Sequence, residues 1–136
     1  KKQEVAVTPV TVPIPPIVST PLPKYNWDTK ENIIHSMRAI GDEEKLSVHQ
    51  KDMLCAICGC ESGYKINAKL INSPTSIDRG LFQINSKYHP EATDELAYNP
   101  EWNTRWACKQ IKSRINSWTA SQHCWNVNGK YYDLLS

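Results

Sequence analysis

The 136 residues carry 16 Lys and Arg against 14 Asp and Glu, and a net charge of only +2 argues against nucleic acid as a partner. The length suits one domain with a real core, and the sequence has no run of about eighteen apolar residues that could span a membrane. Because the sequence starts with Lys, a signal peptide or anchor before Lys1 stays open. Five cysteines are many for this length and favour an oxidising compartment.

The first 24 residues are rich in proline. They hold six of the nine prolines of the chain, mixed with Val, Thr and Ile and without glycine. Such a segment favours an extended conformation and does not form a helix, so we predict a linker or tether over 1–24 and one domain over 25–136. The alternative is an edge strand or arm that packs on the domain, since proline is tolerated at sheet edges.

Three helices are predicted in the domain from residues that mark helix starts. These starts are Asp28 with Glu31, Ser47 with Gln50, and Asn99 with Pro100. Gly41 is expected to end the first helix, and helical spacing of apolar residues carries the second to about Glu61. Ile115 is placed on the apolar side of the third helix.

Between the second and third helices lies a turn-rich segment, 66–89, with a short β-prone run, LFQIN, at 81–85. The predicted fold class is therefore α+β: mainly helical, with a small β or irregular insertion and an extended N-terminal segment.

Two carboxyl groups in contrasting surroundings suggest chemistry. Glu61 lies at the C-terminal end of an apolar helix, where desolvation and the helix dipole both raise the pKa of a carboxyl group, as a general acid requires. Asp78 follows 17 residues later among polar residues and is expected to stay ionised. Such a pair is the arrangement that breaks glycosidic bonds. Taken alone, however, a surface Glu and a turn Asp explain the pair more often.

The sequence motifs around these two carboxyl groups resemble those of a known superfamily. ESGY at 61–64 and SIDRGLFQINS at 76–86 closely resemble the active-site segments of the lysozyme superfamily, both animal-type lysozymes and soluble lytic transglycosylases. NTRWACKQIKS at 103–113 and SWTASQHC at 117–124 extend the likeness more weakly, so that it covers about 47–125. The resemblance implies a lysozyme-like fold and a monomer that acts on peptidoglycan glycan strands, outside the cell or in the envelope.

The resemblance implies three activities. The first is a muramidase that hydrolyses the β-1,4 bond between N-acetylmuramic acid and N-acetylglucosamine, with Glu61 as acid and Asp78 as stabiliser or nucleophile. The second is a lytic transglycosylase, in which Glu61 is acid and then base, the 6-hydroxyl of the sugar attacks, and Asp78 is auxiliary. The third, of another class, is a non-catalytic glycan-binding or assembly domain, since fold does not guarantee activity.

Four polar or aromatic residues are candidate substrate contacts. Gln83 and Asn85 alternate with apolar neighbours as in a short strand, so their amides could face a cleft, or simply a polar strand face. The resemblance places Trp118 at a cleft aromatic position, although core packing explains a Trp as often. Asn72 is a weaker candidate.

The cysteines are interpreted as structural, and no metal or cofactor is expected. A zinc site from Cys55, Cys58 and Cys60 with a histidine is conceivable, yet a regular helix presents this spacing poorly for tetrahedral ligation. The resemblance instead implies that Cys124 is disulfide-bonded to Cys55 or Cys58, with Cys108 in a second bridge.

Overall fold

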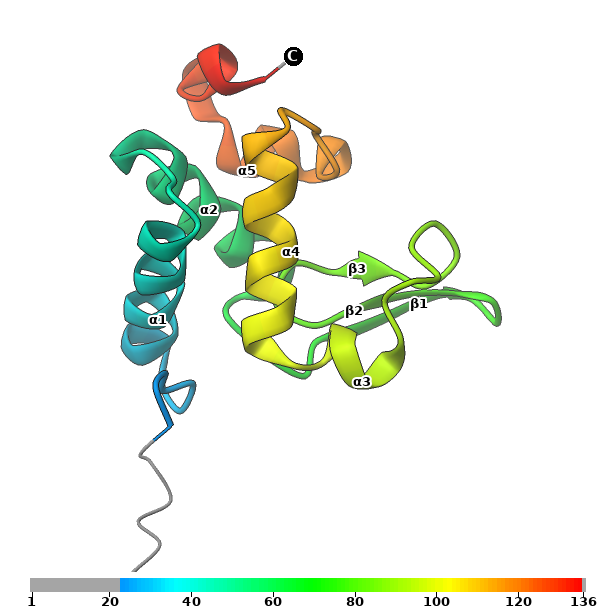
Figure 1. Cartoon of the computed structure of the whole chain (residues 1–136). Helices are drawn as coiled ribbons and strands as arrows, with labels where there is room; N and C mark the ends of the chain where they lie inside the picture. The colour runs from blue at the N-terminus through cyan, green and yellow to red at the C-terminus, as the bar shows by residue number, and fades with distance from the viewer. Residues whose placement is uncertain (1–22, 136) are drawn as a thin grey trace, which may run out of the picture.

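The computed structural model describes residues 23–135, so most of the predicted linker at 1–24 lies outside the described residues. The chain forms five α-helices and a three-stranded sheet within this range (Figure 1). The helices are α1 (Lys30–Glu43), α2 (Val48–Ser62), α3 (Asp94–Ala97), α4 (Pro100–Lys112) and α5 (Gln122–Trp125), and the strands are β1 (Lys69–Ser73), β2 (Ser76–Arg79) and β3 (Ile84–Asn85). Single-turn 3₁₀ helices are η1 (Thr119–Ser121), η2 (Val127–Gly129) and η3 (Tyr132–Leu134). The predicted fold class, α+β and mainly helical, is confirmed.

Both predicted ends of the first helix are wrong. Its N-cap is Thr29 rather than Asp28, because the Thr29 side chain accepts a hydrogen bond from the backbone N–H of Asn32. Gly41 does not end the helix, which continues to Glu43. A Cβ atom at position 41 would lie only 2.8 Å from Cγ of Lys51 on α2, so Gly41 allows α1 and α2 to pack closely.

The other two helix starts are confirmed. Ser47 and Gln50 form the predicted capping box of α2, and Asn99 caps α4 with Pro100 at its first position. Ile115 does not belong to the apolar side of α4, because that helix ends at Lys112 and Ile115 is 52% exposed. In the turn between them Arg114 takes a left-handed conformation, with φ of 57°.

The sheet is antiparallel in the order β1-β2-β3, and β1 is an edge strand. Only the last two residues of the predicted run 81–85 form a strand. Leu81 and Phe82 are fully buried in a turn, and Gln83 has φ of 52°, so the backbone reaches an extended conformation only at Ile84. The β-prone composition reflected core packing rather than strand pairing.

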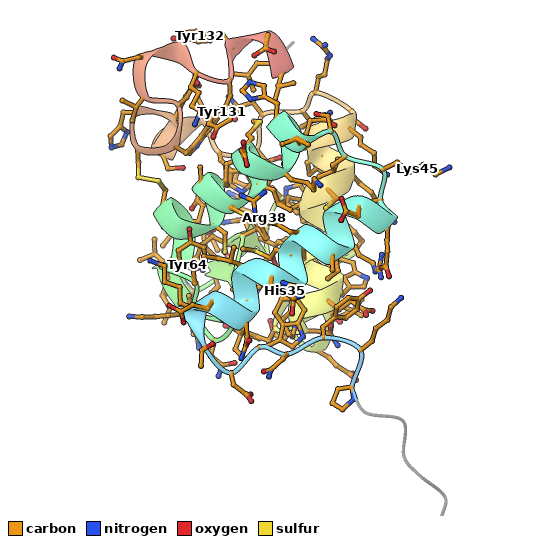
Figure 2. All side chains as sticks on the ribbon, turned by 90° about the vertical axis from the view of Figure 1, so that its left-hand side faces the viewer. His35, Arg38, Lys45, Tyr64, Tyr131 and Tyr132 are labelled. Carbon is orange, nitrogen blue, oxygen red and sulfur yellow. A yellow bond between two sulfur atoms is a disulfide. The ribbon has the colours of Figure 1, made fainter. Side chains whose placement is uncertain are left out.

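Helix α4 packs against α1, α2 and α3, and the sheet lies to one side of it (Figure 1). Arg38 of α1 donates a hydrogen bond to Asp52 of α2 at 2.9 Å where these helices pass each other (Figure 2). About one turn before Asp52, at the start of α2, the buried Tyr131 ring lies 4.9 Å from the His49 ring, and this contact holds the C-terminal segment against the helix. Within residues 23–135, no helix is long and apolar enough to cross a membrane.

Candidate active site

A cavity of about 260 Å³ brings the two predicted carboxyl groups together. Glu61 reaches it from the end of α2 and Asp78 from the middle of β2. The cavity is also lined by Gln83, Asn85, Tyr88, His89, Trp106, Ser117, Trp118 and Ala120. A larger cavity of about 600 Å³, between the start of α1 and the segment after α2, contains neither carboxyl. We take the smaller cavity as the candidate active site because the acid–base groups lie there.

The end of α2 fixes the position of Glu61. Gly63 follows in a left-handed conformation that closes the helix, with φ of 60°. Tyr64 then folds back (Figure 2), and its hydroxyl donates a hydrogen bond to the carbonyl of Cys55 at 3.1 Å. A Cβ atom at position 59 would lie 2.8 Å from that hydroxyl, so Gly59 leaves the room that this ring needs. The ESGY segment is thus a helix end that holds one carboxyl group in place.

Burial dominates the electrostatics of Glu61. Its side chain is partly buried, and this desolvation raises its pKa above the ordinary value of 4.5. The hydroxyl of Ser121, which donates a hydrogen bond to Oε1 of Glu61 at 2.7 Å, lowers the pKa and partly offsets the burial. The charge of Asp78 across the cavity raises it again. The net rise favours the protonated form that a general acid needs.

The sheet holds Asp78 by both carboxylate oxygens. Asn72 on β1 donates its side-chain amide to Oδ2 at 2.9 Å, and Asn85 on β3 donates to Oδ1 at 2.7 Å. The register places Asn85 directly opposite Asp78, while Asn72 lies where the β1–β2 register shifts between Ile71 and Ser73. The predicted substrate residues Asn72 and Asn85 therefore position the carboxylate.

Gln83 stands in a turn that is locked to the helices. Gly80, with φ of +77°, leaves no room for a side chain, because a Cβ atom there would lie 2.4 Å from the carbonyl oxygen of Ala97. The buried Asn103 of α4 accepts a hydrogen bond from the N–H of Phe82 at 3.0 Å. The amide of Gln83 donates to the carbonyls of Ala68 and Gly80. Its nitrogen thus serves the backbone, although the residue lines the cavity.

Trp118 is a wall of the cavity rather than an exposed platform. It is 3% exposed, and its indole N–H donates to the carbonyl of Phe82 at 3.0 Å. Its ring lies edge-on to Trp106 at 6.0 Å, and Trp106 in turn contacts His89. Trp106 and His89 were not predicted to belong to the site. Tyr88, 71% exposed at the cavity, was also missed, although it lies only three residues after Asn85.

The disulfide pairing differs from the expectation. Cys124 is bonded to the α2 helix, but through Cys60, with a Cα–Cα distance of 6.0 Å. Cys55, Cys58 and Cys108 are buried free thiols, so the predicted pairing of Cys55 or Cys58 with Cys124 and the predicted bridge at Cys108 are wrong. Cys55 and Cys58, three residues apart, point into the core, whereas Cys60 is only partly buried at the helix end that contacts α5.

The buried thiols have no acidic character, because burial raises the pKa of both Cys58 and Cys108 to about 12. Among residues 23–135, no group of three or more His, Cys, Asp or Glu side chains is arranged to hold a metal ion.

Two carboxyl groups that face one cavity, one of them with a raised pKa, are the arrangement that cleavage of a glycosidic bond requires. Residues 41–123 match the family model described as "Lysozyme like domain". This match covers more than half of the chain, so the chain belongs to the lysozyme-like domain family. No curated protein and no solved structure matches the chain. Membership of this family supports the assignment of the chain as an enzyme that acts on peptidoglycan, either a glycosidase or a transglycosylase. Glu61 and Asp78 both lie inside the matched range.

Proposed function

We propose that residues 25–136 form a muramidase that hydrolyses the β-1,4 bond between N-acetylmuramic acid and N-acetylglucosamine in peptidoglycan. The observation that carries this proposal is that Glu61 and Asp78 line one cavity from two different walls. The proposal implies a monomer that works outside the cell or in the envelope, where peptidoglycan lies. It needs no metal and no cofactor.

In the first step Glu61 gives its proton to the glycosidic oxygen while the bond from that oxygen to the anomeric carbon breaks. Positive charge develops on the sugar ring, and Asp78 stabilises it through space or attacks the anomeric carbon. The ionised Glu61 then takes a proton from water, whose oxygen bonds to the anomeric carbon; where Asp78 had bonded to that carbon, this bond breaks and Asp78 leaves as the carboxylate. The product has a reducing N-acetylmuramic acid end, and Glu61 is again protonated.

Several other residues that line the cavity are suited to bind the sugar. The exposed Tyr88 ring offers an apolar face for a sugar ring, and the wall beside it offers the side-chain amide oxygen of Gln83. The amide of Asn85 is committed to Asp78, Ser76 and the backbone, so Asn85 acts through Asp78. Trp118 supports this binding from beneath, since its indole N–H is already committed to Phe82. We therefore assign sugar stacking to Tyr88 and wall packing to Trp118.

A lytic transglycosylase is the second candidate, and the contacts of Asp78 favour it. Each carboxylate oxygen of Asp78 already accepts an amide hydrogen bond, so a nucleophilic attack by Asp78 must weaken one of these bonds. If Asp78 is only auxiliary, as in a transglycosylase, it keeps both amide hydrogen bonds throughout the reaction. In that reaction the ionised Glu61 removes a proton from the sugar 6-hydroxyl, whose oxygen then closes the 1,6-anhydro ring.

Mass spectrometry of muropeptides released from purified peptidoglycan separates the candidates. Reducing N-acetylmuramic acid ends would support hydrolysis, and ends lighter by one water would establish the transglycosylase. Glu61→Gln should release muropeptides about 10³-fold more slowly, while Glu95→Gln, which changes an exposed carboxyl on α3, should behave as the wild type. Binding to peptidoglycan without any release would overturn both and leave a binding or assembly domain.

A further inference from the structure

A hydroxyl group from outside helix α2 contacts the carboxyl of Glu61. Ser121, in the turn before α5, lies 60 residues along the chain and places Oγ 2.7 Å from Oε1 of Glu61. The same hydroxyl lies 3.3 Å from the carbonyl oxygen of Trp118. A serine has one hydrogen to donate, so these two oxygens compete for it. The shorter contact to Glu61 takes it when the carboxyl is ionised, since hydrogen bonds to charged groups are stronger.

The segment that carries Ser121 is fastened on both sides of this hydroxyl. Cys124, three residues after Ser121, is bonded to Cys60, the residue directly before Glu61. On the other side, Trp118 donates its indole N–H to the carbonyl of Phe82 and accepts a hydrogen bond at its own carbonyl from the indole of Trp125. The distance between Ser121 and Glu61 is therefore set by covalent and buried contacts rather than by a free loop.

We propose that Ser121 is a positioning residue for Glu61: its hydroxyl binds Oε1 and leaves Oε2 as the oxygen that delivers the proton to the glycosidic bond. This inference rests on the proposed function, because it specifies which oxygen of the general acid reacts. With Oε1 occupied by a donor, a neutral carboxyl carries its hydrogen on Oε2. After proton transfer, the same hydroxyl stabilises the carboxylate that remains.

Ser121 also serves the step in which Glu61 recovers its proton. While its hydroxyl donates to Oε1, the returning proton binds Oε2, so the carboxyl is restored with its hydrogen on the oxygen that delivered it. A hydrophobic side chain at position 121 has no hydroxyl and cannot direct the hydrogen to Oε2 in this way. The inference therefore predicts an effect on turnover and on the pKa of Glu61, and little effect on substrate binding.

Other titratable groups face Glu61 and must be separated from this effect. Asp78 on β2, with Tyr88 and His89 after β3, lines the same cavity, and Cys58 lies one turn back on α2. The pKa of Cys58 is raised to about 12 by burial, so its charge does not change near neutral pH. A pH–rate profile alone reports all the ionisable groups of the cavity together. The pKa of Glu61 therefore has to be measured on its own carboxyl.

The test compares Ser121→Ala and Ser121→Val with Ser121→Thr, which restores the hydroxyl and matches Val in size. Thr119→Ala is the matched control, because it removes an exposed hydroxyl that bonds only to Asn116 in the same turn. For Ala and Val we expect kcat to fall about tenfold at nearly constant KM, the loss typical of a hydrogen bond to a charged group. Loss of the Ser121 hydroxyl should also raise the pKa of Glu61 further, because this hydrogen bond lowers it. Since Glu61 must be protonated to act, the alkaline limb of the pH–rate profile should then move to higher pH.

Carbon-13 NMR titration of the Glu61 carboxyl, assigned by its loss in Glu61→Gln, should show the same upward shift in Ala and Val and its reversal in Thr. An unchanged carboxyl titration in a folded Ala or Val variant would overturn the positioning role, even if kcat fell. If Ala does not fold, the Val and Thr pair decides the question. Full turnover by Glu61→Gln would instead overturn the proposed function, and the NMR titration would still report on the contact itself.

Discussion

The two walls of the cavity hold the same chemical group by opposite means. The helical wall, formed by the ends of α2 and η1, partly buries Glu61 and gives its carboxyl one hydroxyl donor from Ser121. The sheet wall, formed by β1, β2 and β3, surrounds Asp78 with two side-chain amides on mostly accessible strands. The first environment withholds solvent from the charge, and the second supplies hydrogen bonds to it.

The walls also differ in how they are fastened. The helical wall is closed by the Cys60–Cys124 disulfide and a set of buried tryptophans, whereas the sheet wall ends in β1, an edge strand whose residues Leu70 and Ile71 are 55% and 62% exposed. In the proposed reaction, this difference puts a firmly held proton donor opposite a carboxylate on more accessible strands. The two carboxyl groups should therefore respond to mutation in different ways.

Glu61→Gln should have the largest effect on activity, because it removes the acidic proton of the general acid in the helical wall. We expect kcat/KM to fall about 10³-fold, as is typical when a general acid is lost. Gln keeps the shape of Glu and can still accept the hydrogen bond from Ser121, so the fold should persist. Turnover on purified peptidoglycan and the circular dichroism spectrum check both points. Activity within a few fold of the wild type would remove Glu61 from the mechanism.

Asp78→Asn should have the second-largest effect and should separate the two reactions. A hydrolase that needs the negative charge opposite the sugar should lose on the order of 10²-fold in kcat, comparable to the loss of one electrostatic stabiliser. A transglycosylase with an auxiliary Asp78 should keep most of its rate. The rate and the mass of the product ends, measured on the same samples, show which holds. A large loss with 1,6-anhydro products would contradict this link between charge and hydrolysis.

Much of the fold was predictable because it depends on neighbouring residues. Capping pairs such as Ser47 with Gln50 act within one turn, so the starts of α2 and α4 follow from local chemistry. The end of α1 could not be read in this way. Gly41 has the local character of a stop, and only the approach of Lys51 from another helix explains why a glycine stands inside a helix.

The candidate site likewise contains residues that local sequence predicts and residues that depend on contacts between distant segments. Glu61 and Asp78 were selected by the words around them, and the structure places both on one cavity. Ser121 was not selected, because a serine 60 residues from its partner gives no pattern in the sequence. The choice of Cys60 over Cys55 and Cys58 depends on which face of α2 meets α5, which spacing within the helix does not reveal.

Removal of the disulfide tests whether the helical wall is rigid for catalysis or only for stability. Cys60→Ser with Cys124→Ser should lower the free energy of unfolding by about 2–4 kcal/mol, since the bridge closes a loop of 64 residues. We also expect kcat to fall about tenfold at a temperature where the variant is folded, because the contact of Ser121 with Glu61 loosens. Denaturant titration and steady-state kinetics measure the two effects. Unchanged kcat would limit the bridge to stability.

The two amides of the sheet wall should differ in importance. Asn85 donates to Asp78 and to Ser76 and accepts from the backbone of Lys87 and Tyr88, whereas the exposed Asn72 has the single contact with Asp78. We expect about a fivefold loss of kcat for Asn85→Ala and about twofold for Asn72→Ala, because exposed hydrogen bonds contribute less. Equal losses, or a larger loss for Asn72→Ala, would mean that Asn72 binds substrate directly.

The smallest effect concerns stability and has a sign opposite to that on activity. Burial raises the pKa of Glu61 in the folded protein above its ordinary value of 4.5, so folding opposes its ionisation. Below pH 4.5 the carboxyl is neutral in both states and has no such effect. As the pH rises from 4.5 to the raised pKa of the folded protein, the unfolded chain ionises first, and the wild type loses stability relative to Glu61→Gln, which has no charge to bury. The variant should therefore melt at a higher temperature near neutral pH and at the wild-type temperature in acid, as differential scanning calorimetry can measure. A lower melting temperature near neutral pH would mean that the hydrogen bond from Ser121 outweighs the desolvation, and the helical wall would then stabilise the charge as the sheet wall does.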